Sequence, residues 1–107
     1  IDFSSVLSIM KNSGRALFGV GRAKGENRAI DAATKAINSS LLDFSIKGAK
    51  GVLFNVSGQD ITLNEIQEAA KVITKNVDAK SQIIFGAVKD NTLLKDEIKI
   101  TVIATKF

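Results

Sequence analysis

The sequence predicts an α+β domain, a two-layer sandwich in which two main helices and a short N-terminal helix pack a four-stranded mixed sheet. Residues 97–105 alternate apolar and polar side chains, which is typical of a strand with one buried and one wet face. Three further apolar runs are strand candidates: 15–22, 51–57 and 82–88. Two segments between them repeat apolar residues every three or four positions, as amphipathic helices do: 28–39 and 63–77.

Composition limits the chemistry that the chain can perform. Its 107 residues suffice for one domain, spanning 1–107, and 45% hydrophobic with 24% charged residues fits a globular fold. Cysteine and histidine are both absent, which excludes disulfides, thiolate or imidazole metal ligands and Ser-His or Cys-His catalysis. No apolar run approaches the roughly 20 residues that a membrane-spanning helix needs.

The net charge of +4 leaves two interpretations open. A basic balance suits nucleic acid or an anionic membrane surface. Solvated surface lysines are the simpler explanation, because no run of Lys and Arg reaches the five to eight residues of a basic patch. The chain starts at Ile1 without methionine, so we expect a piece of a longer protein.

The N-terminal half predicts close packing between a strand and a helix. A short helix is expected over 4–12, with Asp2, Ser4 or Ser5 as N-cap. Gly19 and Gly21 in the next strand lack side chains, so another element can approach them closely. Residues 24–27 are typical of a turn. The apolar side of the 28–39 helix is mostly alanine, so we expect this helix to lie close against the sheet or a neighbouring helix.

The second main helix carries a recognisable start signal. Thr62 and Glu65 have the spacing of a capping box. One apolar stripe follows: Leu63, Ile66, Ala70, Ile73 and Val77. The acidic and basic residues of this helix (Glu65, Glu68, Lys71 and Lys75) predict a solvated face with weak ion pairs, and a partner-binding face is the alternative.

Three features offer candidate binding chemistry, each with a structural alternative. Gly19–Gly25 lies between a strand and a helix, where anions bind, but its GxGxxxG spacing matches neither a dinucleotide fingerprint nor a P-loop, and packing is favoured. Asn55 and Ser57 end a strand, where they could line a cleft or bond the next turn. The six phenylalanines could stack bases, but three of them lie in apolar runs that predict core positions: Phe18, Phe54 and Phe85.

A series of motifs, in order, resembles the C-terminal domain of FtsZ, the tubulin-like division GTPase. The matching blocks read MKNSG, ALFGVG, AKGENRA, AATKAINSSLL, GAKGVLFNV, LNEIQEAA and ITVIATKF. Ser40 stands where proline is usual, and Lys106 replaces a glycine. The resemblance covers nearly the whole chain and implies a four-stranded sheet packed by helices.

The resemblance implies a role in filament assembly and GTP hydrolysis. FtsZ-like proteins stack head to tail, and a loop with the motif N-x-D-x-x-D enters the nucleotide pocket of the next subunit. Asp2 falls on the first acidic position and Ser5 on the second, where serine cannot carry a negative charge. Asp2 is thus the candidate catalytic residue, and the candidate subunit interface comprises Phe3, Ser4, Ser5, Thr62 and Glu65.

The resemblance also implies what the chain lacks. GTP and Mg²⁺ belong to the nucleotide-binding domain of the longer protein, so we expect no cofactor, no metal and no independent activity in this fragment. Expected partners are further FtsZ subunits and division regulators, without nucleic acid or direct membrane contact. The expected location is the cytoplasmic mid-cell division ring of bacteria, or of organelles of bacterial origin. Two rivals remain: a small basic nucleic-acid-binding module, and a regulatory domain that binds an anion at Gly19–Gly25.

Overall fold

The computed structural model describes residues 16–39 and 46–105. Six predicted strands and helices recur, five with small shifts at their ends and the strand at 97–105 with the predicted bounds. The elements are β1 Ala16–Lys24, α2 Arg28–Ile37, the 3₁₀ turn η1 Ile46–Gly48, β2 Gly51–Gly58, α3 Leu63–Lys75, β3 Gln82–Lys89 and β4 Glu97–Thr105. The helix expected over 4–12 lies outside the described residues.

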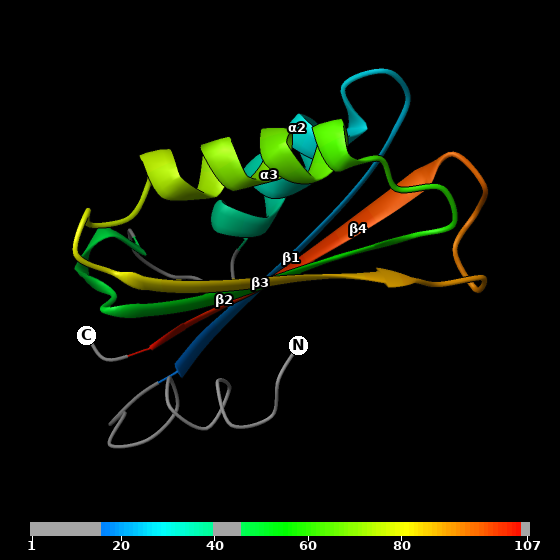
Figure 1. Ribbon diagram of the computed structural model, residues 1–107. Coiled ribbons are helices and arrows are strands. Elements are labelled where there is room, and N and C mark those ends of the chain that lie inside the picture. Colours follow the sequence, from blue (N-terminus) through cyan, green and yellow to red (C-terminus); the bar gives the residue numbers. More distant parts are fainter. Residues whose placement is uncertain (1–15, 40–45, 106–107) are drawn as a thin grey trace.

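The four strands form one mixed sheet in the order β1-β4-β2-β3 (Figure 1). β4 pairs antiparallel with both β1 and β2, whereas β2 and β3 are parallel and are joined by α3 as a crossover. Strands that are far apart in the sequence therefore meet at the centre of the sheet, with Phe54 of β2 opposite Val102 of β4. The order leaves β1 and β3 as the two edges of the sheet.

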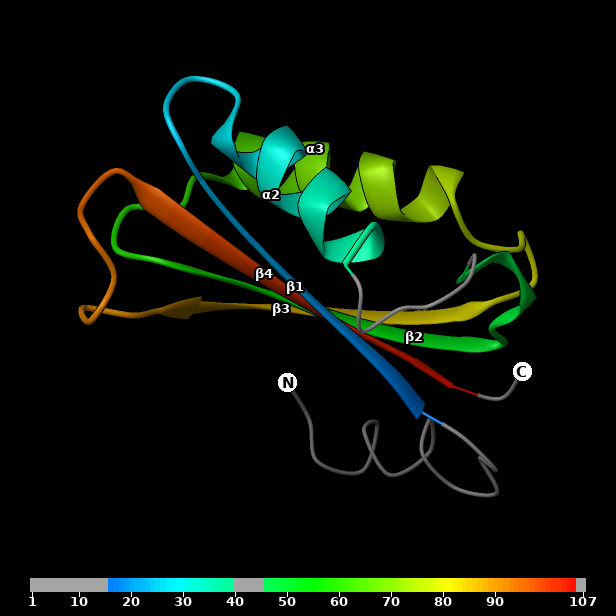
Figure 2. The same cartoon turned by 180° about the vertical axis from the view of Figure 1, so that it is seen from behind.

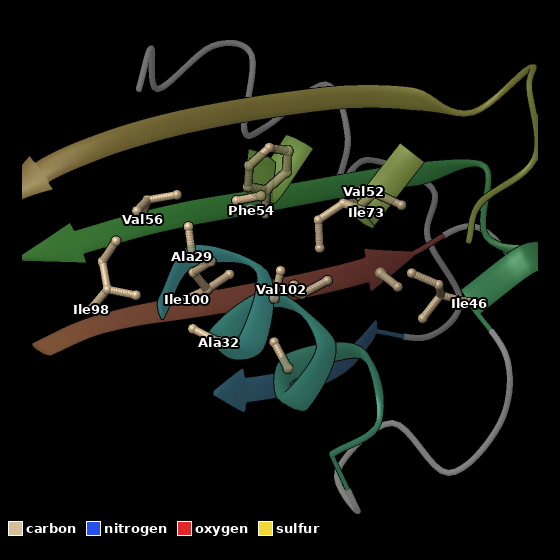
Figure 3. Packing of buried hydrophobic residues seen from close by; sticks show 14 of the residues in the cluster. Ala29, Ala32, Ile46, Val52, Phe54, Val56, Ile73, Ile98, Ile100 and Val102 are labelled. Atoms are coloured by element: carbon tan, nitrogen blue, oxygen red, sulfur yellow. The ribbon is translucent and has the colours of Figure 1, made fainter. Parts of the chain in front are cut away.

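Both α-helices of the described residues cover the same face of the sheet (Figures 1 and 2). The core lies between the two layers, where Phe54, Ile73 and Ile100 are almost fully buried (Figure 3). β4 supplies every second residue to it, and these side chains are all fully buried: Ile98, Ile100, Val102 and Ala104. The alternation predicted for 97–105 is thereby confirmed, and it identifies the helix-covered face.

Helix α2 packs tightly on β1 because small residues lie on both contacting surfaces. Its buried residues are all alanines: Ala29, Ala32, Ala33 and Ala36. A Cβ atom added to Gly21 would lie 2.1 Å from the backbone oxygen of Ala32 and 2.6 Å from the backbone nitrogen of Ala36. Gly21 therefore permits the close approach that the sequence predicted.

Three predicted core positions are wrong. Leu63, placed on the buried stripe of α3, is 70% exposed and is the first residue of that helix. Phe18 and Phe85 are 44% and 56% exposed. Both lie on edge strands, which have a neighbour on one side only. Phe85 nevertheless stacks on Phe54, with ring centroids 5.6 Å apart.

Candidate assembly surface at the start of helix α3

The structure describes two of the predicted site residues, Thr62 and Glu65. Both lie where α3 begins, after the loop that leaves β2. The remaining members of the predicted site, Asp2, Phe3 and the pair Ser4–Ser5, lie outside the described residues. The catalytic assignment of Asp2 therefore stays a prediction.

Thr62 and Glu65 form the predicted capping box. The backbone N–H of Glu65 donates to Oγ1 of Thr62 at 3.1 Å, and the backbone N–H of Thr62 donates to Oε1 of Glu65 at 3.1 Å. Two amides without an intrahelical acceptor are thus satisfied. The carboxylate also sits at the helix N-terminus, where the helix dipole favours negative charge.

The carboxylate of Glu65 has a second partner that the sequence did not suggest. Arg28, the first residue of α2, donates from Nε to Oε2 at 2.5 Å and from Nη2 to Oε1 at 2.8 Å. Both side chains are mostly buried, at 11% exposure for Arg28 and 15% for Glu65. This bidentate pair joins the starts of the two helices. The sequence predicted a solvated face of α3 that includes Glu65, whereas the carboxylate of Glu65 faces Arg28 of α2.

The ion pair fixes the charge state of both groups. The hydrogen bonds from Arg28 hold the pKa of Glu65 below its ordinary value of 4.5, helped by the Thr62 amide and opposed by burial. The same pair raises the pKa of Arg28 above its ordinary value, again against burial. Glu65 is therefore ionised at neutral pH, with its negative charge balanced inside the domain.

The loop before α3 is anchored at three points. Nη2 of Arg28 donates to the backbone oxygen of Asp60 at 2.6 Å, and Nε2 of Gln59 donates to the backbone oxygen of Leu93 at 2.7 Å. The backbone N–H of Asp90 donates to the oxygen of Gly58 at 2.9 Å. The loop after β2 is thus tied both to α2 and to the loop between β3 and β4.

Exposed residues lie at this anchored turn before α3. Thr62, Leu63 and Asn64 are exposed in the first turn of α3, and Leu63 presents an apolar side chain to solvent. A hollow of about 190 Å³ lies beside them, lined by Gly58, Gln59, Ile61, Ile66, Ala87, Val88 and Lys89. An apolar side chain on a rigid turn, beside a partly apolar hollow, is suited to docking against another protein.

The rival binding sites gain little from the geometry. Atoms of α2 occupy the space beside Gly21, and Gly25 lies in the turn with a positive φ of 95°. Phe18 lies on the same face of the sheet as Ile103, Leu53 and Ile84, which are paired in register across the strands. Phe85 follows Ile84 in β3, so its ring points to the opposite face from that of Phe18. They cannot form one base-stacking platform. Asn55 donates to Oγ of Ser57 at 3.1 Å, a contact within one strand.

The described residues contain neither a cluster of metal ligands nor a membrane-spanning helix. No group of three or more Asp or Glu side chains among residues 16–39 and 46–105 is placed to hold a metal ion. No helix in the same ranges is long and apolar enough to cross a membrane.

Comparison with known proteins agrees with this architecture. Residues 14–107 match the C-terminal domain of the FtsZ family. The fold superposes on an FtsZ dimer from M. jannaschii with a TM-score of 0.91 and 36% identity, covering 99% of this chain and 31% of that one. The match to a second M. jannaschii FtsZ structure, a W319Y mutant, has the same TM-score and covers 32% of that chain. GDP-bound CetZ1 from Haloferax volcanii shares the fold at a TM-score of 0.78 and 16% identity.

The fold and the motif blocks together define an FtsZ-type C-terminal domain, a four-stranded sheet with two helices on one face. The chain belongs to the FtsZ family and corresponds to its C-terminal domain. It spans about a third of the length of the solved FtsZ chains that it matches.

Proposed function

We propose that this domain stacks head to tail on the nucleotide-binding domain of a second FtsZ subunit and activates GTP hydrolysis there. The observation that supports this proposal most strongly is the family match over residues 14–107. A matching M. jannaschii structure is itself described as an FtsZ dimer. GTP and Mg²⁺ would be held by the nucleotide-binding domain of the longer protein, so this domain alone would be inactive.

The surface at the start of α3 supports the docking half of the proposal. Its exposed residues, Thr62, Leu63 and Asn64, stand on a turn fixed by the capping box and by Arg28. A surface fixed before binding loses less conformational entropy on association. Glu65 would act there by holding the turn, because Arg28 already neutralises its charge.

Asp2 would supply the catalytic half. A carboxylate beside a bound triphosphate can position the attacking water and a nearby cation, and phosphoryl transfer depends mainly on such placement. Ser5 offers a hydroxyl where the family motif has a second carboxylate. We therefore expect activation by Asp2 at a reduced rate.

The expected cellular setting follows from the same proposal. The domain would work in the cytoplasmic division ring, in contact with other FtsZ subunits and with division regulators. It would touch neither nucleic acid nor the membrane directly. No specific structural feature within residues 16–39 and 46–105 favours the nucleic-acid-binding alternative.

Two substitutions in a full-length protein carrying this domain test the catalytic half. Asp2→Ala should abolish polymer-dependent GTP turnover while filaments still form, because the loop loses its carboxylate. Ser5→Asp should raise turnover by restoring the second charge. Unchanged turnover in Asp2→Ala, with assembly intact by sedimentation, would refute the assignment of Asp2.

A separate substitution tests the docking surface. Leu63→Glu should weaken head-to-tail assembly, because it places an unpaired charge at the contact. Ile30→Glu is the matched control, since Ile30 is also an exposed apolar helix residue, at 37%, but lies on α2. Equal sedimentation of the two variants would exclude Leu63 from the interface.

A further inference from the structure

The surface at the start of α3 is too small to form a stable contact alone. Its exposed residues are Thr62, Leu63 and Asn64. A stable protein interface takes roughly 20 to 30 residues from each partner. A contact that begins at Leu63 must therefore continue onto neighbouring parts of the domain.

Two further connections lie at the same end of the domain as the start of α3. They are the turn between β1 and α2 (residues 25–27) and the loop between β3 and β4 (residues 90–96), on the right of Figure 1 and on the left of Figure 2. The turn exposes no large apolar side chain, since its residues are Gly25, Glu26 and Asn27. The loop exposes Leu94, at 56%. The apolar surface therefore continues toward the loop 90–96.

The loop 90–96 is tied to the turn that begins α3. Nε2 of Gln59 donates to the backbone oxygen of Leu93 at 2.7 Å. The backbone N–H of Asp90 donates to the oxygen of Gly58 at 2.9 Å. Leu93 is itself buried, at 5% exposure, so it anchors the loop from within. The loop and the turn are thus positioned relative to each other before any partner binds.

The backbone at Leu94 is held as well. Its N–H donates to Oε1 of Glu97 at 3.4 Å, and its oxygen accepts from the N–H of Glu97 at 3.0 Å. Leu94 therefore resembles Leu63, because each is an exposed leucine on an anchored turn. Burying either one against a partner requires little additional ordering of the backbone.

The hollow of about 190 Å³ lies between these two parts of the surface. Ile61 and Ile66 line it from the side of α3, and Ala87 and Val88 line it from the end of β3 that leads into the loop. Val88 is 50% exposed. An apolar side chain of a partner that fills this hollow would lie between the start of α3 and the end of β3. Such a filled pocket is typical of the centre of a protein interface.

We propose that the loop 90–96 forms the second half of the head-to-tail contact, with Leu94 as its apolar anchor and Gln59 as the residue that positions the loop. The partner is the nucleotide-binding domain of the next FtsZ subunit, so this inference rests on the proposed function. Continuity of the surface supports the same partner for both halves. A body of ordinary interface size that covers Leu63 and fills the hollow also reaches the loop that is tied beside it.

Binding of the 107-residue chain to a matching isolated nucleotide-binding domain tests the anchor. Leu94→Glu should raise the Kd roughly tenfold, because it brings an unpaired charge into the contact. Ile30→Glu is the matched control, since it adds the same charge at an exposed apolar residue of α2. Isothermal titration calorimetry would measure the Kd, and thermal melting would check that both variants fold.

The outcomes separate this inference from the proposed function. If Leu94→Glu binds as tightly as the parent chain while Leu63→Glu binds more weakly, the contact at α3 stands and the second half is overturned. If the parent chain does not bind at all, both the proposed function and this inference are overturned.

Hydrogen exchange in the complex tests the extent of the contact. Backbone amides in both 62–64 and 91–95 should exchange more slowly when the nucleotide-binding domain is bound. A complex that slows exchange in 62–64 alone would overturn the inference.

A double-mutant cycle tests the positioning by Gln59. Gln59→Ala removes the hydrogen bond to Leu93 and should weaken binding roughly threefold. In that background Leu94→Glu should have a smaller effect than in the parent chain, because the loop is no longer held in place. Fully additive effects would show that Gln59 does not position Leu94.

Discussion

The side chain of Arg28 joins three parts of the described structure. Its guanidinium binds both oxygens of Glu65 and the backbone oxygen of Asp60, so one side chain joins α2, α3 and the loop between β2 and α3. Arginine suits this role because its planar fork matches a carboxylate at two points. The two residues lie 37 positions apart, and no local pattern in the sequence links them.

Arg28→Ala should lower the free energy of unfolding by about 2 to 3 kcal/mol, because it leaves the mostly buried Glu65 carboxylate without its main partner. Urea titration would measure the loss. Arg22→Ala is the control. Its pair with Glu97 spans 4.0 Å and its side chain is 56% exposed, so the expected change is below about 1 kcal/mol. Equal losses would show that the Arg28 pair contributes no more than a surface pair.

The Glu65 pair should make stability depend on pH in acid. Since the folded pKa of Glu65 lies below 4.5, its contribution is full above the unfolded pKa and is lost as pH falls through the folded value. The difference in unfolding free energy between the parent chain and Glu65→Gln should therefore be constant near neutrality and shrink below about pH 4.5. A difference that stays constant down to pH 3 would contradict this account.

Gly21 shows how one missing side chain fixes an interface. Gly21→Ala should destabilise the fold by about 3 kcal/mol or more, because the new Cβ meets the backbone of α2, which cannot move away as a side chain could. Gly25→Ala meets no atom within 4 Å and pays only for its positive φ, about 1 to 2 kcal/mol. Thermal melting of both variants would measure the stability that each loses. A smaller loss than expected for Gly21→Ala would show that α2 can shift.

At the scale of elements, local signals predicted most of the structure. The strand at 97–105 has the bounds expected from its alternation, and the capping box begins α3 at Leu63. Strand order could not be predicted in the same way, because it depends on contacts between distant segments. That order decides which strands are edges, and so why Phe54 is buried while Phe18 and Phe85 are exposed.

The candidate site was predictable only in part. Thr62 and Glu65 carry a motif that acts within four residues, so the sequence revealed them. The contribution of Arg28 was missed because an ion pair between two helix starts depends on how the helices pack. The sequence block AKGENRA, which contains Arg28, carries no local motif that assigns a partner to that side chain.

Thr62→Ala should weaken the start of α3 by about 1 kcal/mol, because the amide of Glu65 loses its acceptor. Thr62→Ser keeps the hydroxyl and serves as the control. Hydrogen exchange at the Glu65 amide would locate the effect. Equal exchange in the two variants would mean that the capping bond contributes little.

At the scale of the whole molecule, the domain presents one surface for its proposed contact with the next subunit. The start of α3 offers exposed groups on an anchored turn. The chain spans 31% of the FtsZ chain from M. jannaschii that it matches, so its proposed activity needs a nucleotide-binding domain from the longer protein.

The central claim is that this domain activates GTP hydrolysis in a neighbouring subunit. The most direct measurement is GTP turnover on mixing the 107-residue chain with a matching isolated nucleotide-binding domain. We predict that turnover rises with the concentration of the chain and that Asp2→Ala removes the rise. Formation of the complex by sedimentation without any increase in turnover would contradict the claim and leave the domain with a structural role in the filament.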